Sequence, residues 1–194
     1  MTDKNILIVG VGGQGTLLAS RILGDVAINT GNDVKVSEVH GMSQRGGNVV
    51  TYVKMAKTVY SPVIEKNEAD IVLCFEQLEA LRWIDYAKKD ATIIINTQKI
   101  APMPVVMAKA KYPEEIIEKI KSNYPNVVDM PALDMAKKCG SNKAVNVVMI
   151  GVLAKHTEIA KEVWLDAIKK TVKPKFVEMN IKAFESGYNY VENA

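Results

Sequence analysis

The feature that most constrains the fold is a strand that runs into a glycine turn and then into a helix. Residues 5–10, NILIVG, are a continuous apolar run ending in glycine, which is typical of a strand buried on both faces. Residues 17–28, LLASRILGDVAI, then repeat apolar side chains at helical spacing. This opening predicts an α/β protein in which helices cover a parallel sheet.

The rest of the chain alternates in the same way. Its apolar and β-branched runs predict strands at 34–39, 48–55, 69–75, 91–96 and 126–130, with a further short strand within 104–110. Helical spacing predicts helices at 76–90, 114–123, 131–138, 143–155, 158–170 and 175–190.

Loop length then fixes one strand direction. Only residues 40–47 join the second and third strands, which is too short for a parallel crossover, so we expect this pair to be antiparallel. We therefore expect a three-layer, Rossmann-like fold with helices on both faces of a mostly parallel sheet that has one antiparallel neighbour. No linker or repeat divides the chain, which predicts a single domain over residues 1–194.

Composition excludes several classes of function. The 25 basic and 22 acidic residues give a net charge of +3, which is too balanced to favour nucleic acid. The longest apolar runs, 71–75 and 147–154, fall well short of the roughly 20 residues that span a bilayer, and the first residues lack a signal-peptide pattern. We expect a cytoplasmic protein that binds neither nucleic acid nor membrane.

Metal and cluster sites are not expected in this chain. Cys74 and Cys139 are far apart and suit apolar packing, whereas an iron–sulfur cluster needs about four thiolates. His40 and His156 also lack acidic or cysteine neighbours at ligand spacing. No side chain stands out as a catalytic group.

The glycine turn is the first candidate binding element. Its spacing is G-x-G-x-x-G between a strand and a helix, where glycine permits close approach of a ligand and the helix start favours an anion. The alternative is that the turn only packs the helix on the sheet. The candidate residues are Gly10, Gly12, Gly13, Gln14 and Gly15.

A second candidate loop follows the second strand. Glu38 stands where a nicotinamide-binding fold carries its ribose-binding acid, but VHGMSQRGG follows at once. The hydroxyl, amide and guanidinium donors of this loop suit a phosphate, a carboxylate or another subunit. The alternative is that the loop is a plain hairpin connection whose arginine lies in solvent. The candidate residues are Ser43, Gln44, Arg45, Gly46 and Gly47.

Other polar residues near this edge favour structural roles. Glu76 and Glu79 suit the first turn of a helix, where carboxylates complement the dipole. Asn146, in an apolar helix, suits a hydrogen-bonded core or interface amide. Asn96 and Thr97 fit either a ligand crevice or an ordinary turn.

Taken together, several segments resemble the gamma-domain family of the 2-oxoacid:ferredoxin oxidoreductases. The resemblance covers nearly the whole chain, and the pairing of the glycine turn with the second loop is its most specific part. AVNVVMIG and FVEMNIKAFE favour the small (beta) subunits of the indolepyruvate branch over the pyruvate branch. The segments are IVGVGGQGTLLASRIL, VHGMSQRGGNVVTYVK, YSP, ADIVLCFEQLEALR, IIINTQ, AVNVVMIG and KFVEMNIKAFESG.

The resemblance implies one subunit of an enzyme. The family oxidatively decarboxylates 2-oxoacids, here aryl ones such as indolepyruvate, to acyl-CoA and passes electrons to ferredoxin. Thiamine diphosphate and the iron–sulfur clusters are implied in a large (alpha) subunit, with no cofactor in this chain. The sequence agrees, because Gly24-Asp25 is followed by Val26 where a thiamine diphosphate site would carry Gly-Asp-Gly. We expect coenzyme A (CoA) as the ligand of the glycine turn, the large subunit as the partner, and ferredoxin to be reached through the complex.

Other assignments of function remain open at this point. The chain could be the gamma subunit of a pyruvate or other 2-oxoacid oxidoreductase. A stand-alone NAD(P)-dependent oxidoreductase has Glu38 in its favour, but no second substrate domain or Tyr-x-x-x-Lys spacing is evident. An adenylating enzyme of the ubiquitin-activating type begins alike but lacks HGMSQRGG. The apolar last three helices also predict a surface buried against the large subunit, or self-association of the isolated chain.

Overall fold

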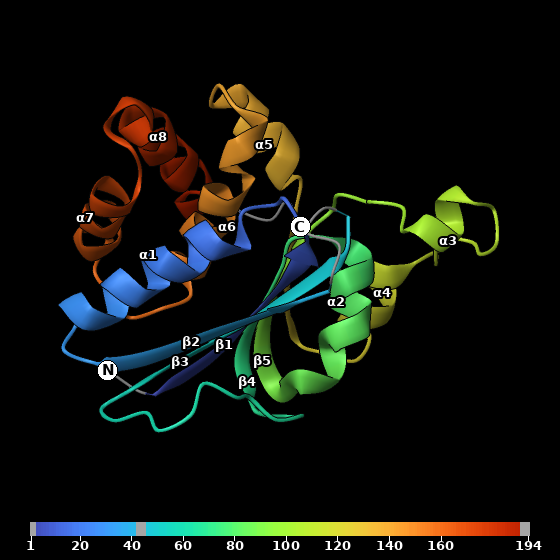
Figure 1. Ribbon diagram of the computed structural model, residues 1–194, viewed down its shortest axis with the longest axis horizontal. Helices are drawn as coiled ribbons and strands as arrows, with labels where there is room; N and C mark the ends of the chain where they lie inside the picture. Colours follow the sequence, from blue (N-terminus) through green and yellow to red (C-terminus); the bar gives the residue numbers. More distant parts are fainter. Residues whose placement is uncertain (1–2, 42–45, 191–194) are drawn as a thin grey trace.

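The computed structural model describes residues 3–41 and 46–190 and contains one six-stranded sheet (Figure 1). The strand order is β2-β3-β1-β4-β5-β6. Their bounds are β1 Lys4–Val11, β2 Asp33–His40, β3 Asn48–Ala56, β4 Ala69–Cys74, β5 Ala87–Asn96 and β6 Asn126–Met130.

Strand directions agree with the expectation from loop length. β1, β4, β5 and β6 pair in parallel, whereas β3 is antiparallel to both of its neighbours, β1 and β2. The carboxyl ends of β1 and β4 therefore meet the start of β3 at one edge, where Val11 pairs with Asn48. The prediction of a mostly parallel α/β sheet with one antiparallel strand is confirmed.

Helices cover both faces of the sheet (Figure 1). One layer contains the long helix after the glycine turn and the C-terminal helices; the other contains two shorter helices. The first layer is α1 Thr16–Asn29, α5 Ala132–Lys138, α6 Val145–Lys155, α7 Lys161–Thr171 and α8 Val177–Tyr188; the second is α2 Gln77–Trp83 and α4 Ile116–Lys121. The remaining helix, α3 Met103–Val106, projects from the body (Figure 1).

Successive side chains of β1 point to opposite faces of the sheet, and each face has its own apolar core. Ile6 and Ile8 pack with α1 and the C-terminal helices, whereas Leu7 and Val9 pack with α2 and α4. Every residue of α6 except Lys155 is buried. Its apolar composition therefore reflects burial within this chain and is no reason to expect a partner there. Burial of another part of the last three helices, or of the adjoining loops, against the large subunit stays a prediction, as does self-association.

Two expected elements differ from the structure. The strand expected within 104–110 is wrong, because this segment lies away from the sheet and instead forms α3, whose N–H groups bond within the turn. The helix expected over 76–90 ends at Tyr86 after a short 3₁₀ turn, and β5 begins at Ala87, which pairs with Ala69. Within residues 3–41 and 46–190, no helix is long and apolar enough to cross a membrane.

Candidate ligand-binding site

The glycine turn between β1 and α1 is left-handed at two positions. Gly13 has φ +102° and Gly15, the N-cap of α1, has φ +83°, values that side chains other than glycine rarely adopt. The Gly15 carbonyl accepts hydrogen bonds from Leu18 and Ala19, but the N–H groups of Gly13, Thr16 and Leu17 find no acceptor among the described residues. These N–H groups and the dipole of a 14-residue helix favour an anion at this point.

The described part of the second loop lies directly against this turn. The Gly12 N–H donates to the Gly47 carbonyl at 2.8 Å, and the Gly46 N–H lies 3.5 Å from the Gly12 carbonyl. These bonds continue the β1–β3 ladder beyond the pairing of Val11 with Asn48. The structure therefore brings the two predicted loops together, although Ser43, Gln44 and Arg45 lie outside the described residues.

Gly10 and Gln14 have close structural partners, and Gln14 also lines the larger of the two hollows beside the turn. A Cβ on Gly10 would lie 2.9 Å from Gln14 Oε1 and 3.0 Å from Phe75 Cβ. Gln14 Oε1 accepts from the Val11 N–H at 2.8 Å, and its Nε2 donates to the Phe75 carbonyl at 2.9 Å. These contacts give both residues a packing role, and ligand binding at Gly10 and Gln14 stays a prediction.

A small amide network positions Gln98 at the rim of the site. Asn96 is fully buried, and its Nδ2 donates to the Phe75 carbonyl at 3.0 Å and to Gln98 Oε1 at 3.3 Å. Gln14 Nε2 lies 3.5 Å from the same Gln98 oxygen, and the Gln77 N–H donates to the Gln98 backbone carbonyl at 3.3 Å. Contacts with Asn96 at the end of β5, Gln77 after β4 and Gln14 in the turn after β1 thus hold Gln98 beside the glycine turn.

Two hollows flank the glycine turn, and their charges differ. The larger, of about 540 Å³, lies between the turn and the start of α6, and Lys143 is the one charged side chain among its described lining residues. The smaller, of about 440 Å³, lies toward β2 and contains Glu38 and His40. Since Lys143 attracts an anion and the Glu38 carboxylate repels one, a phosphate is favoured on the α6 side.

Glu38 already has partners on two elements. Its Oε2 accepts from Thr16 Oγ1 and from Thr51 Oγ1, both at 3.1 Å. These bonds join β2 to the first turn of α1 and to β3. An acid at this position therefore has a structural explanation that needs no nicotinamide ribose.

Helix α6 completes the site from more than a hundred residues away in the sequence. Asn146 is 2% exposed and its Nδ2 donates to the Gly15 carbonyl at 3.1 Å, which confirms the expectation of a hydrogen-bonded core amide. A Cβ on Gly15 would lie only 2.5 Å from that nitrogen. Gln98 lies in the 96–98 segment that was expected at the ligand edge of the sheet, and it lines the larger hollow. Lys143 was not predicted as a site residue and carried no sequence signal.

The two carboxylates after β4 also have structural partners. Glu76 is fully buried and caps α2, where its Oε2 accepts from the Glu79 N–H at 3.0 Å, as expected for the start of a helix. Burial raises the pKa of Glu79, and the Arg82 guanidinium, 2.6 Å from its Oε1, opposes that shift. Neither carboxylate is among the residues that line the two hollows.

The described residues do not fit thiamine diphosphate or an iron–sulfur cluster. Cys74 is fully buried, burial raises the pKa of its thiol, and Cys139 lies elsewhere. No group of three or more His, Cys, Asp or Glu suited to a metal occurs in the described part of the chain. Asp25 lies inside α1, where Lys170 Nζ at 2.6 Å and Thr171 Oγ1 at 2.9 Å occupy its carboxylate.

Comparison with known proteins identifies the family. The family model for pyruvate ferredoxin/flavodoxin oxidoreductase matches residues 5–190. This chain belongs to that family. It is 41% identical over 189 residues to the indolepyruvate oxidoreductase subunit IorB of Archaeoglobus fulgidus, covering 95% of this chain and 94% of the relative.

Two further comparisons, one of sequence and one of fold, show more distant similarities. It is 26% identical over 186 residues to the common subunit gamma of the pyruvate/ketoisovalerate oxidoreductases of Pyrococcus furiosus, covering 94% of each. Its fold matches a solved structure of the 2-oxoglutarate:ferredoxin oxidoreductase of Magnetococcus marinus with 2-oxoglutarate, coenzyme A and succinyl-CoA bound. That match has a TM-score of 0.72 at 17% identity and covers 97% of this chain and 31% of the other, which shows the fold alone.

Proposed function

We propose that the chain is the small subunit of an indolepyruvate ferredoxin oxidoreductase. In this assignment it supports the CoA-dependent oxidative decarboxylation of aryl 2-oxoacids, with electrons passed to ferredoxin. The observation that carries it is the 41% identity to an indolepyruvate oxidoreductase subunit over nearly the full length of both chains. The common gamma subunit of the pyruvate and ketoisovalerate enzymes, at 26%, supports the broader family more than that branch.

Thiamine diphosphate and the clusters belong to the large subunit in this proposal. The cofactor would supply the carbanion chemistry of decarboxylation and the clusters would carry the electrons. Nothing among the described residues of this chain suits either group, and Asp25 and Cys74 are committed to the fold. The contribution of this subunit is therefore binding and positioning.

CoA is the ligand we assign to the glycine turn. Its diphosphate is anionic and suits the free N–H groups at the start of α1, while Lys143 adds a positive charge on the α6 side. Gln98, held by Asn96 and Gln14, supplies an amide at the same rim. Arg45, with Ser43 and Gln44, would add a guanidinium and further donors from the second loop. The Magnetococcus enzyme with CoA bound contains the same fold, which is consistent with this assignment.

Reconstitution tests the proposed function. The chain alone should reduce no ferredoxin with indolepyruvate and CoA, and addition of the large subunit should restore the reaction. Robust activity of the chain alone, free of thiamine diphosphate and iron, would contradict the proposal. A reconstituted complex that prefers pyruvate to indolepyruvate would assign the chain to the pyruvate branch instead.

A further inference from the structure

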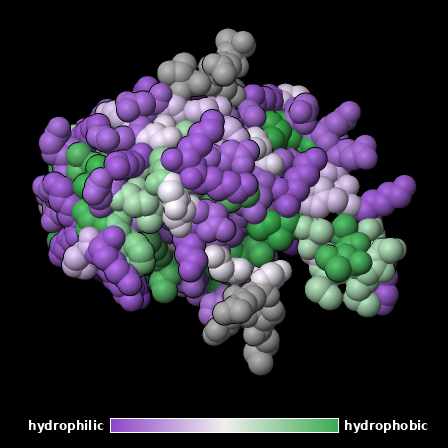
Figure 2. Space-filling view, turned by 90° about the horizontal axis from the view of Figure 1, so that it is seen from above, coloured by the Kyte–Doolittle hydropathy of each residue, from purple (hydrophilic) through white to green (hydrophobic). Residues whose placement is uncertain are grey.

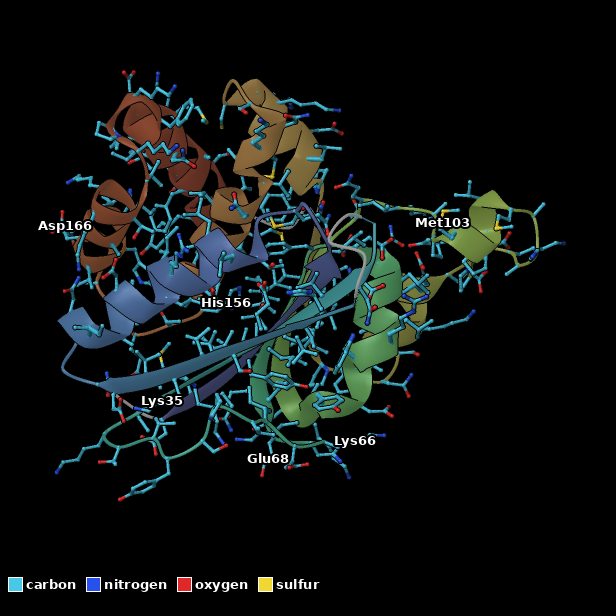
Figure 3. All side chains as sticks on the ribbon, in the orientation of Figure 1. Lys35, Lys66, Glu68, Met103, His156 and Asp166 are labelled. Atoms are coloured by element: carbon cyan, nitrogen blue, oxygen red, sulfur yellow. The ribbon has the colours of Figure 1, made fainter. Side chains whose placement is uncertain are left out.

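An apolar arm projects from the site edge of the molecule. Residues 99–112, named here the arm, leave the sheet after β5, form α3 and return toward α4 (Figure 1). Met103 and Val106 are each 64% exposed and Met107 is 54% exposed. Figure 2 shows apolar side chains gathered on this projection, and in Figure 3 the labelled Met103 lies on α3, away from the main body.

The arm has a defined shape of its own. Val106 and Met107 donate N–H groups to the carbonyls of Pro102 and Met103, and Lys109 donates to the Pro104 carbonyl at 2.8 Å. Ala108 has φ +56°, a left-handed conformation that an alanine rarely adopts. These bonds keep the three exposed apolar side chains on one short turn, so little ordering is needed when a partner binds.

A buried carboxylate fastens both ends of the arm to the body. Glu76 Oε1 accepts from the Ile100 N–H at 3.0 Å on the outgoing side and from the Tyr112 hydroxyl on the returning side. The Tyr112 oxygen also accepts from the Leu78 N–H at 3.1 Å. These hydrogen bonds fix the two ends of the arm to the body. Because Gln98 lies just before the arm, the fixed ends are near the proposed CoA site.

The charges of the arm define the chemistry that would bind it. Residues 97–113 include Lys99, Lys109 and Lys111 and no acidic residue. Lys109 and Lys111 are exposed, next to the apolar turn. The complementary surface is an apolar groove with acidic residues at its rim. Two arms packed against each other across a two-fold axis would instead bring lysines together, which disfavours a second copy as the occupant.

We infer that the arm is a docking element that inserts Met103, Val106 and Met107 into an acid-rimmed apolar groove of the large subunit. The inference rests on the proposed function, because it requires that partner. Because the arm starts directly after Gln98, which lines the larger hollow, a partner seated on the arm would approach the sheet edge that contains the glycine turn.

Apolar contacts are tested with a matched pair of variants of the full chain. The double variant Met103→Asp/Val106→Asp should weaken binding to the separately purified large subunit about a hundredfold, measured by isothermal titration, with an unchanged thermal midpoint. Ile28→Asp is the control, because Ile28 is 61% exposed and lies at the end of α1. It should change the dissociation constant by less than about threefold.

Charge is tested with two pairs of exposed lysines. Lys109→Glu/Lys111→Glu should slow association about tenfold and flatten its dependence on salt, because complementary charge acts mainly on the association rate. Lys57→Glu/Lys66→Glu, on exposed lysines between β3 and β4, should change neither. An equal effect of both pairs would mean that the whole charge of the chain steers association, and would overturn the assignment of the acidic rim to the arm.

The outcomes separate the inference from the proposed function. If wild-type chain forms an active complex and the Met103→Asp/Val106→Asp variant binds equally well, the docking inference fails and the proposed function stands. If wild-type chain forms no complex with the large subunit, both fail. If the double variant loses only self-association, measured by light scattering, the arm binds a second copy and the inference is overturned.

Discussion

Glycine has opposite uses at two places in this molecule. In the turn after β1, Gly13 has a left-handed backbone and no atom would meet its Cβ within 4 Å. Between α6 and α8, Gly151 and Gly187 are ordinary helical residues, but a Cβ on either would overlap the backbone of the facing helix. The carbonyls in the way are those of Phe184 and Val148.

The difference separates a site from a scaffold. An open glycine turn leaves N–H groups and space for a ligand, whereas the helix pair uses glycine to remove space so that two backbones pack closely. We expect a substitution at the open position Gly13 to change ligand binding more than folding, whereas Gly15, which is crowded by Asn146, should affect both. Substitutions in the second region should change folding first.

Gly151→Ala should have the largest effect. The added methyl group would meet the Phe184 carbonyl and lie 2.8 Å from the Tyr188 nitrogen, so α6 and α8 must separate. Overpacking of this kind costs about 3 kcal/mol, reduced by about 1 kcal/mol through the better helix propensity of alanine. Denaturant titration should show a net loss of roughly 2 kcal/mol or more. A variant more stable than wild type would refute the close packing of these helices.

Gly15→Ala should come next. Alanine at φ +83° costs about 1–2 kcal/mol, and its Cβ would lie 2.5 Å from Asn146 Nδ2. We expect the free energy of unfolding to fall by roughly 2 kcal/mol. The Michaelis constant of the complex for CoA should also rise. The double variant Gly15→Ala/Asn146→Ala should recover part of the stability, because it removes the overlap but not the backbone strain. An additive double variant would argue against the contact.

Gly13→Ala distinguishes most clearly between an effect on folding and an effect on ligand binding. Its stability loss should be about 1 kcal/mol from the positive φ alone, since nothing crowds the site. The methyl group enters the hollow over the turn, so the Michaelis constant for CoA should rise about tenfold if a phosphate approaches this backbone. A normal CoA constant in the assembled complex would remove Gly13 from the binding site.

Gly24→Ala, the smallest effect, is the matched control for the helical glycines. Gly24 lies inside α1 and its Cβ would meet nothing within 4 Å. Alanine should therefore stabilise the chain by about 0.5–1 kcal/mol through helix propensity and a less flexible unfolded state. A destabilised Gly24→Ala variant would show that the comparison of free and crowded glycines fails.

The parts of the fold that depend on local sequence patterns could be predicted. The buried strands and the antiparallel β2–β3 pair follow from apolar runs and from the length of the 40–47 loop. Residues 104–110 have β-branched side chains typical of a strand, but no neighbouring strand reaches them and they form α3 instead. The boundary at Ala87 has no glycine or proline to mark it, so pairing with β4 alone reveals it.

The site was predictable only in its local part. The spacing of Gly10, Gly12 and Gly15 identifies the turn. Asn146 and Lys143 join it through the packing of α6 on α1, which depends on contacts across more than 120 residues of sequence. Spacing also could not show that Gln14 bonds the turn to Phe75 after β4, or that Gly10 leaves room for the Phe75 side chain. Those roles depend on which strand lies beside β1.

The most direct test of the account is the Arg45→Ala variant, measured in the complex with the large subunit for both CoA dependence and subunit affinity. If the second loop binds a CoA phosphate, loss of this charge-assisted contact of about 1.5–3 kcal/mol should raise the Michaelis constant for CoA about ten- to a hundredfold, with folding and assembly unchanged. Arg45→Lys should fall between, because it keeps the charge and loses the planar fork. A weaker complex with a normal CoA constant would assign Arg45 to the partner. An Arg45→Ala complex normal in both would contradict a binding role for the loop and leave it a hairpin connection.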